Sequence, residues 1–114
     1  MQRHRLARYS RLTGQRHFKK LLGSKPATRG QFFNIYALSN NQPFARLGIV
    51  VGKRMVRGAV PRNYLKRLIR ETFRQEQHRL AGYDLLVRVR RPPPERNGAI
   101  ARVELLRLLA KVAE

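Results

Sequence analysis

Two periods alternate along this chain, and the changes between them divide it into helices and strands. Short runs of aromatic and β-branched residues, the composition typical of strands, occur at 31–38, 45–51 and 83–91. Apolar residues spaced three and four positions apart, as on one face of a helix, occur within 13–23, 58–78 and 99–112. The pattern therefore predicts the order helix, strand, strand, helix, strand, helix.

The segments between these elements carry residues that end helices or turn the chain. Thr13 is suited to cap the first helix, and Gly23 to end it. Residues 24–30 are predicted to form a loop. The sequence SNNQP at 39–43 predicts a turn that leaves the second strand antiparallel to the first.

This order favours an α+β domain in which helices pack on a small mixed β-sheet. The second strand, the central helix and the third strand form a β-α-β unit, and parallel crossovers of that kind are right-handed in the great majority of cases. The last helix is predicted to have a broad apolar face that includes Ile100 and Val103. We expect one domain over residues 1–114, with 1–12 as a flexible basic arm.

The central helix separates its apolar from its cationic residues most clearly. Gly58 opens it, and Pro61 is tolerated in its first turn. On a wheel of about 100° per residue, one arc of roughly 140° collects polar and basic side chains. These are Arg62, Asn63, Lys66, Arg67, Arg70 and Arg74. Most of the remaining side is apolar, so the helix is predicted to dock on a core and present its cations outward.

The charge of the whole chain indicates the kind of partner that those cations meet. The net charge is +20, and 17 of the 26 basic residues precede Glu71, the first acid in the sequence. Surface ion pairs cannot neutralise such an excess. A polyanion is therefore expected, and nucleic acid is the first candidate because phosphate contacts release counterions.

Composition also argues against several classes of protein. The absence of cysteine excludes disulfides, thiolate catalysis and Cys-based zinc sites, and the three histidines lack ligand spacing. The few acids form no catalytic pair, so we expect no catalytic residue, no protein-held metal and no small-molecule substrate. No apolar run is long enough for a membrane span, so we expect a cytoplasmic protein without a membrane partner.

The stretch GKRMVRGAVPRNYLKRLIRETFR at 52–74 resembles the signature of the protein component of bacterial ribonuclease P. The signature pairs are Arg62-Asn63, Lys66-Arg67 and Arg70-Glu71, and the likeness extends over roughly residues 6–112. It implies a fold like the second domain of ribosomal protein S5, with a left-handed β-α-β crossover. It also implies a function: the protein assists the removal of the 5′ leader from precursor tRNA, while the RNA subunit and its Mg²⁺ carry the chemistry.

The resemblance assigns two groups of residues. The catalytic RNA is expected to bind Arg62, Asn63, Lys66, Arg67 and Arg70, whose donors suit phosphate and ribose. The single-stranded leader is expected to bind Phe18, Leu22, Tyr36, Lys53 and Arg54. Leu22 stands where the family has an aromatic residue, so stacking is expected to be weaker there. Core packing remains the alternative for Phe18, and coverage of a sheet edge for Tyr36.

Three other functions share some of these features. A structural RNA-binding protein of ribosomal type has the same charge and size, but lacks the ordered signature. A helix-turn-helix DNA binder needs a second helix just before the basic one, where a strand and a glycine-rich loop are predicted. A membrane-active cationic helix does not need three strands.

Overall fold

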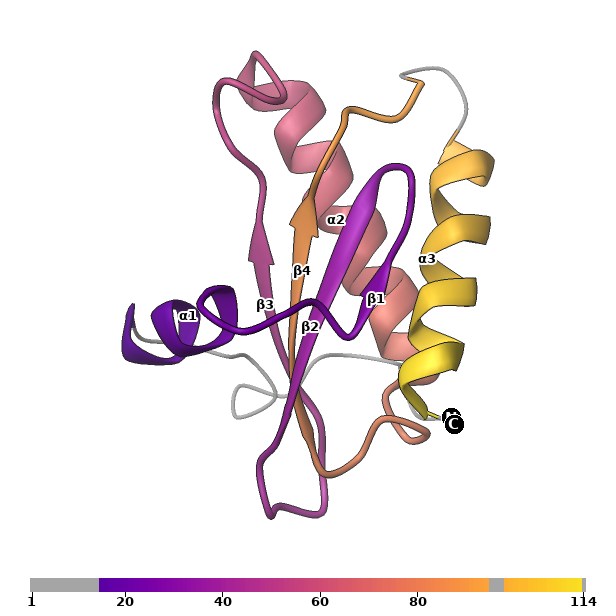
Figure 1. The fold of residues 1–114 in the computed structure, drawn as a ribbon. Helices are drawn as coiled ribbons and strands as arrows, with labels where there is room; N and C mark the ends of the chain where they lie inside the picture. The colour runs from indigo at the N-terminus through magenta and orange to yellow at the C-terminus, as the bar shows by residue number, and fades with distance from the viewer. Residues whose placement is uncertain (1–14, 95–97, 114) are drawn as a thin grey trace.

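The described part of the chain folds into three helices and four strands. The computed structural model describes residues 15–94 and 98–113, with side chains described from Lys19 onward. In chain order the elements are α1 (Gln15–Leu22), β1 (Thr28–Arg29), β2 (Phe33–Ser39), β3 (Arg46–Val50), α2 (Ala59–Glu76), β4 (Tyr83–Val89) and α3 (Gly98–Ala113) (Figure 1). The α+β class and the six predicted elements are confirmed. Thr13 and the arm at 1–12 lie outside the described residues.

The four strands form one mixed sheet in the order β1-β2-β4-β3. β2 is antiparallel to β4 from Phe33↔Val89 to Ser39↔Tyr83, and β3 is parallel to β4. β2 and β3 therefore run in opposite directions, as predicted, but β4 lies between them and the turn at 39–43 does not close a hairpin. The last strand of the chain lies between β2 and β3. One of its faces buries Leu85, Val87 and Val89, and the other carries Leu86 between Asp84 and Arg88.

The predicted loop at 24–30 contains a short strand. Thr28 and Arg29 pair antiparallel with Ile35 and Asn34, which makes β1 one edge of the sheet. The Gly30 N–H donates to the Phe33 carbonyl at 2.8 Å and closes the turn into β2. Two residues carry too little pattern for a strand to be predicted from sequence, so this element was missed.

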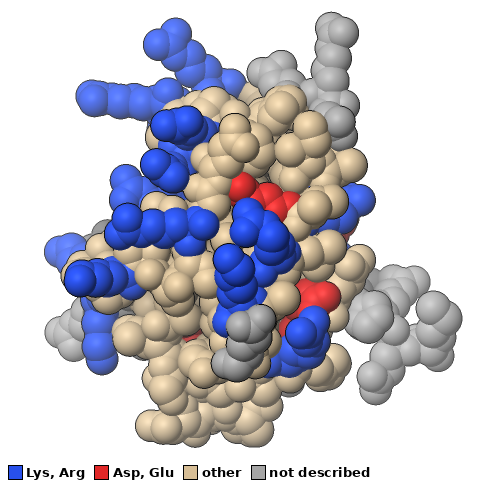
Figure 2. All heavy atoms as spheres, turned by 45° about the vertical axis from the view of Figure 1, so that its right-hand side comes forward, with Lys and Arg blue, Asp and Glu red and all other residues tan. Residues whose placement is uncertain are grey.

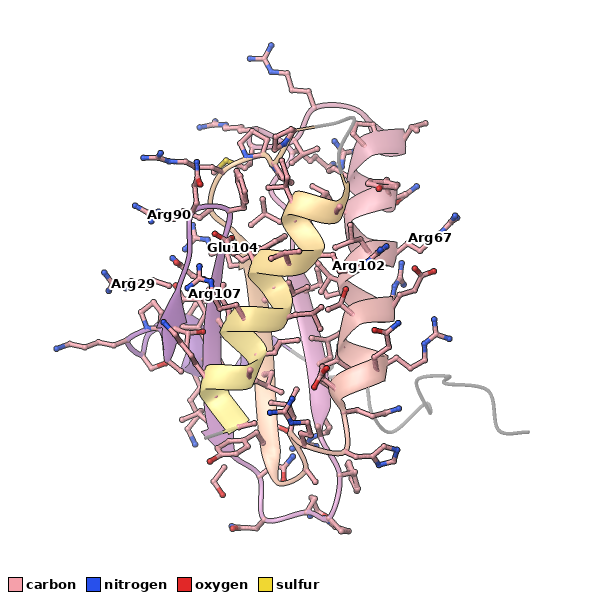
Figure 3. The ribbon with its side chains drawn as sticks, turned by 90° about the vertical axis from the view of Figure 1, so that its right-hand side faces the viewer. Arg29, Arg67, Arg90, Arg102, Glu104 and Arg107 are labelled. Carbon is pink, nitrogen blue, oxygen red and sulfur yellow. The ribbon has the colours of Figure 1, made fainter. Side chains whose placement is uncertain are left out.

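The crossover from β3 through α2 to β4 is left-handed. In Figure 1 both strands run upward, β4 lies to the right of β3, and α2 descends behind the sheet. Figure 3 gives the same depth, since α2 there lies to the right of the strands, which is the side that faces away from the viewer in Figure 1. The general expectation of a right-handed crossover is wrong here, and the handedness that the resemblance implies is confirmed.

Helices α2 and α3 cover one face of the sheet, and α1 lies on the other. The main core lies under α2 and α3 and takes alternate residues of the strands, among them Phe33, Ile35, Leu85 and Val87. Leu65, Leu68, Ile69 and Phe73 of α2 are buried in it, as the helical pattern predicted. On the α1 face a smaller cluster holds Leu21, Tyr36 and Leu86.

Helix α3 is fastened to the β1–β2 turn by a buried carboxylate. Glu104 points from α3 into this turn (Figure 3), where its oxygens accept the N–H groups of Gln31, Phe32 and Phe33 at 2.5, 2.8 and 3.1 Å. Gly30 leaves room for the carboxylate, because a Cβ there would lie 2.5 Å from the Glu104 Cδ. This long-range contact is one that the periodic pattern of the last helix does not reveal.

The apolar face predicted for the last helix is narrower than expected. Ala101, Leu105, Leu108 and Leu109 are buried, but Ile100 and Val103 are 43% and 66% exposed. Among the described residues, no helix combines the length and the apolar composition needed to cross a membrane.

Candidate nucleic-acid interface

The cationic face of α2 stands free of the core. Arg67 and Asn63 are exposed, and Arg62, Lys66 and Arg70 are partly exposed, while the opposite side of the helix is buried. Gly58 precedes the helix with φ 93°, a conformation that favours glycine, and so starts the helix after the loop at 52–58. The five residues predicted to bind the catalytic RNA therefore lie together on one helix.

These cations have no acidic partners in the described part of the chain. Its three ion pairs are Arg46–Asp84, Arg79–Glu76 and Arg107–Glu104, and none of them involves the cationic face of α2. Figure 2 shows Lys and Arg side chains over much of one side of the molecule, with acidic atoms surfacing in few places. Guanidinium and ammonium groups arranged in this way suit the phosphates of a nucleic acid, which they can bind by charge-assisted hydrogen bonds.

Arg62 differs from the other four because it also supports its own loop. One of its terminal nitrogens donates to the Val56 carbonyl at 3.1 Å, and Val56 is 6% exposed. The same loop turns back through hydrogen bonds from the N–H groups of Met55 and Val56 to the Gly52 carbonyl. Arg62 thus ties the start of α2 to the segment that carries Lys53 and Arg54.

The five residues predicted to bind the leader are spread over α1, β2 and the loop after β3. Lys53 and Arg54 are exposed in that loop, beyond the carboxyl end of β3. Leu22 is 37% exposed at the end of α1. Phe18 lies in α1, but its side chain is outside the described residues. The face of the sheet that α1 partly covers extends between these elements.

Tyr36 lies on this face but offers little surface to a ligand. It is 5% exposed and packs with Leu21 and Leu86, so α1 covers its ring. Beside it, the register places Asn34 of β2 opposite Arg88 of β4. The Asn34 Oδ1 is buried without a hydrogen-bond partner, whereas Arg88 is exposed. A stacking role for Tyr36 requires α1 to shift and remains a prediction.

A polar cluster that the sequence did not reveal lies at the other end of this face. Arg46 of β3 forms a bidentate ion pair with Asp84 of β4, Nε to Oδ1 at 2.6 Å and the terminal nitrogen to Oδ2 at 2.7 Å. The Asn40 side chain also donates to Oδ1, at 3.0 Å. The parallel pairing of β3 with β4 places Arg46 directly beside Asp84, although 38 positions separate them in the sequence.

Tyr64 was also missed as a candidate. It stands within the signature on α2, and its side chain is 47% exposed. Its aromatic character, at a wheel position beside the cationic arc, was the available signal. For metal binding, the residues that the structure describes contain no cluster of three or more His, Asp or Glu side chains.

The fold and this surface first define a class: a basic α+β protein whose exposed helix face suits a nucleic-acid backbone. The Ribonuclease P family profile matches residues 6–113. The ribonuclease P protein component of Chromobacterium violaceum is 36% identical over 113 residues, which are 99% of this chain and 93% of that protein. The component from an Azoarcus species is 34% identical over 85% of this chain and 81% of its own length.

Solved structures agree with the sequence relatives. The RNase P protein of Staphylococcus aureus has a TM-score of 0.79 at 28% identity, over 92% of this chain and 98% of its own. That of Thermotoga maritima, in complex with 1-(4-fluorophenyl)-2-thiourea, has a TM-score of 0.75 at 30% identity, over 87% and 96% of the two chains. The chain belongs to the ribonuclease P protein family, and it is a protein component of this endoribonuclease.

Proposed function

We propose that this protein binds the RNA subunit of ribonuclease P through α2 and holds the 5′ leader of precursor tRNA on the α1 side of the sheet. The observation that carries the proposal is the cationic face of α2, whose side chains form none of the ion pairs of the described residues. The chemistry belongs to the RNA subunit and to Mg²⁺ ions held mainly by that RNA. The protein's part is to neutralise phosphates and to position the substrate.

The division between two RNA partners follows the two sides of the molecule. The exposed residues of α2 point away from the sheet, whereas Leu22 and Arg88 lie with α1 on its other face. Lys53 and Arg54 lie in the loop that joins the two sides, because β3 leads into it and α2 leaves it. An arrangement of this kind supports a protein placed between a folded RNA and a single strand.

Cleavage of precursor tRNA by the reconstituted complex across Mg²⁺ concentrations tests the proposal. With the protein present, the RNA subunit should cleave at low Mg²⁺, where the RNA alone fails. The stimulation should be lost on a substrate without a leader if the protein contacts the leader directly. Unchanged cleavage and unchanged leader affinity on addition of the protein would contradict the proposal, and recovery with ribosomal RNA instead would support a ribosomal role.

A further inference from the structure

We propose that a cavity at the start of α2 receives one unstacked nucleobase of the RNA subunit, an inference that rests on the proposed function. The cavity measures about 580 Å³ and lies between the loop before α2, the first two turns of α2, the proline run after β4 and the start of α3. It lies beside the cationic face of α2 and is separate from the α1 side of the sheet. Its walls include Met55, Val60, Tyr64, Pro93 and Gly98.

The walls expose apolar side chains in the most basic stretch of the protein. Val60 is 81% exposed, Tyr64 47% and Met55 37%. Exposed apolar residues that gather in one hollow mark a binding surface more often than isolated ones do. A hollow of this size is also within the range of pockets that hold small organic groups, which are of the order of 300–1,000 Å³.

The ring of Tyr64 lies against the first residue of α3. A Cβ on Gly98 would collide with the Tyr64 hydroxyl, and Leu68 also approaches Gly98, so the ring reaches from α2 to the first residue of α3. Only a residue without a side chain at position 98 lets the ring take this place. A ring held in this way loses little freedom when a flat group stacks on it, which favours binding.

The charges around the cavity select the occupant. Arg57 lines it, and Arg67 follows Tyr64 by three positions, so it lies on the neighbouring part of the helix surface. A group that enters this apolar hollow and also meets these arginines would combine a flat, weakly polar centre with negative charge beside it. An unstacked nucleotide has this form, with its base between two phosphates.

Single-stranded or bulged RNA fits better than a helix or a protein segment. In an A-form duplex the bases are stacked and paired, and a base cannot enter a concave site without leaving the stack. A peptide would need acidic residues on both sides of an aromatic one to meet the same charges. The RNA subunit already lies against α2 under the proposed function, so the cavity is within reach of the same partner.

The test compares three variants in binding to the RNA subunit. Tyr64→Leu keeps apolar bulk but removes the ring, and Tyr64→Phe keeps the ring. Val103→Ala removes a still more exposed apolar group from α3, 66% exposed against 47% for Tyr64, as a control. We expect Tyr64→Leu to weaken binding by roughly 5- to 150-fold, the range for one stacked base. Tyr64→Phe and Val103→Ala should stay within about twofold of the wild type.

Base-specific chemical probing of the RNA subunit provides a second readout. One unpaired nucleotide should be protected by the wild type and by Tyr64→Phe, and should become reactive with Tyr64→Leu. Gly98→Ala supplies the same test without removal of the ring, because the added Cβ displaces the Tyr64 hydroxyl. It should also weaken binding and restore reactivity at that nucleotide, while thermal unfolding of each free variant confirms that it is folded.

Several outcomes would overturn the inference. These are wild-type affinity for Tyr64→Leu, a loss with Tyr64→Phe as large as with Tyr64→Leu, and protection that maps to the tRNA or to no nucleotide. Each leaves the proposed function intact if the wild-type protein still binds the RNA subunit and stimulates cleavage. Failure of the wild type to do either contradicts the proposed function and the inference together.

Discussion

The two faces of the sheet differ sharply in how they are covered. Under α2 and α3 lies a continuous core of 18 buried residues that includes Phe73, Ile69 and Leu105. On the α1 face, the described side chains, which begin at Lys19, form a smaller buried apolar cluster of Leu21, Tyr36 and Leu86, with Leu38 and Val50 packed against it. Within the described residues, the same strands therefore supply a deep core on one side and a thin one on the other.

This difference places most of the hydrophobic stabilisation on one face of the sheet. Hydrophobic stabilisation grows with the apolar area removed from water, so the α2–α3 face carries most of it. Helix α1 buries Leu21 but leaves Leu22 and both its lysines exposed, and a helix of eight residues has little stability of its own. The thin face can yield to a ligand without unfolding the protein, whereas the deep face cannot.

The largest expected effect is the loss of stability when a buried side chain is truncated on each face of the sheet. Phe73 on α2 is fully buried, so Phe73→Ala should lower the free energy of unfolding by about 3–5 kcal/mol. Leu21→Ala on the thin face should cost about 2 kcal/mol, the low end for such a change, because α1 can settle onto the gap. Urea unfolding of the two variants measures both values, and equal losses would show that the faces contribute alike.

The next effect concerns the carboxylate that fastens α3 to the deep face. Glu104→Gln replaces one acceptor oxygen by an NH₂ group that meets backbone donors, so we expect a loss of about 2–3 kcal/mol. Glu76→Gln is the matched control, since Glu76 forms only a surface pair with Arg79 and should cost less than about 1 kcal/mol. Chemical denaturation compares the two, and a similar small loss for both would mean that α3 is held by its apolar face alone.

A smaller expected effect distinguishes the charge on α2 from charge elsewhere on the protein. Figure 3 shows Arg67 projecting from the outer side of α2, while Arg102 of α3 points toward α2. Arg67→Ala should weaken binding of the RNA subunit by about tenfold, as expected for one charge-assisted contact, and lower the salt slope by about one. Arg29→Ala, on the far edge of the sheet, should leave the slope unchanged. Binding titrations at several salt concentrations measure both slopes, and equal changes would indicate non-specific attraction.

The smallest expected effect is a gain in affinity for precursor tRNA from a substitution on the α1 face. Leu22 is partly exposed at the end of α1, and Leu22→Phe adds an aromatic face where a leader base could stack. Affinity for precursor tRNA should rise by about fivefold, the lower end for one stacked base, while affinity for tRNA without a leader should not change. An equal rise for both substrates would show that residue 22 contacts the tRNA body or only stabilises α1.

Local patterns predicted most of the elements and the separation of apolar from cationic residues on the central helix. The central helix was predicted at 58–78 and observed at Ala59–Glu76, because its apolar and basic residues separate within single turns. The third strand was placed correctly with Leu85, Val87 and Val89 buried. The cationic arc of α2 was also predicted, since the six residues that form it are near neighbours in one helix.

What failed depends on parts of the chain that are distant in sequence. Strand order and the added edge strand β1 are set by which strands pair, and no short window contains both partners. The left-handed crossover was predicted by the family resemblance and not by the local pattern. Ile100 and Val103 are exposed because the direction in which α3 docks is chosen in part by Glu104 and the β1–β2 turn. The burial of Tyr36 likewise follows from where α1 lies.

The sequence by itself thus determined the elements, their apolar faces and the cationic helix, because these rest on periodicity and charge within a few turns. Only the tertiary structure decided how the two faces of the sheet are covered. It also brought Tyr64 against Gly98, 34 positions later in the chain, and so formed the cavity beside α2. The physical reason is that close packing joins residues by volume and not by order, so a surface built from several elements appears only once they are assembled.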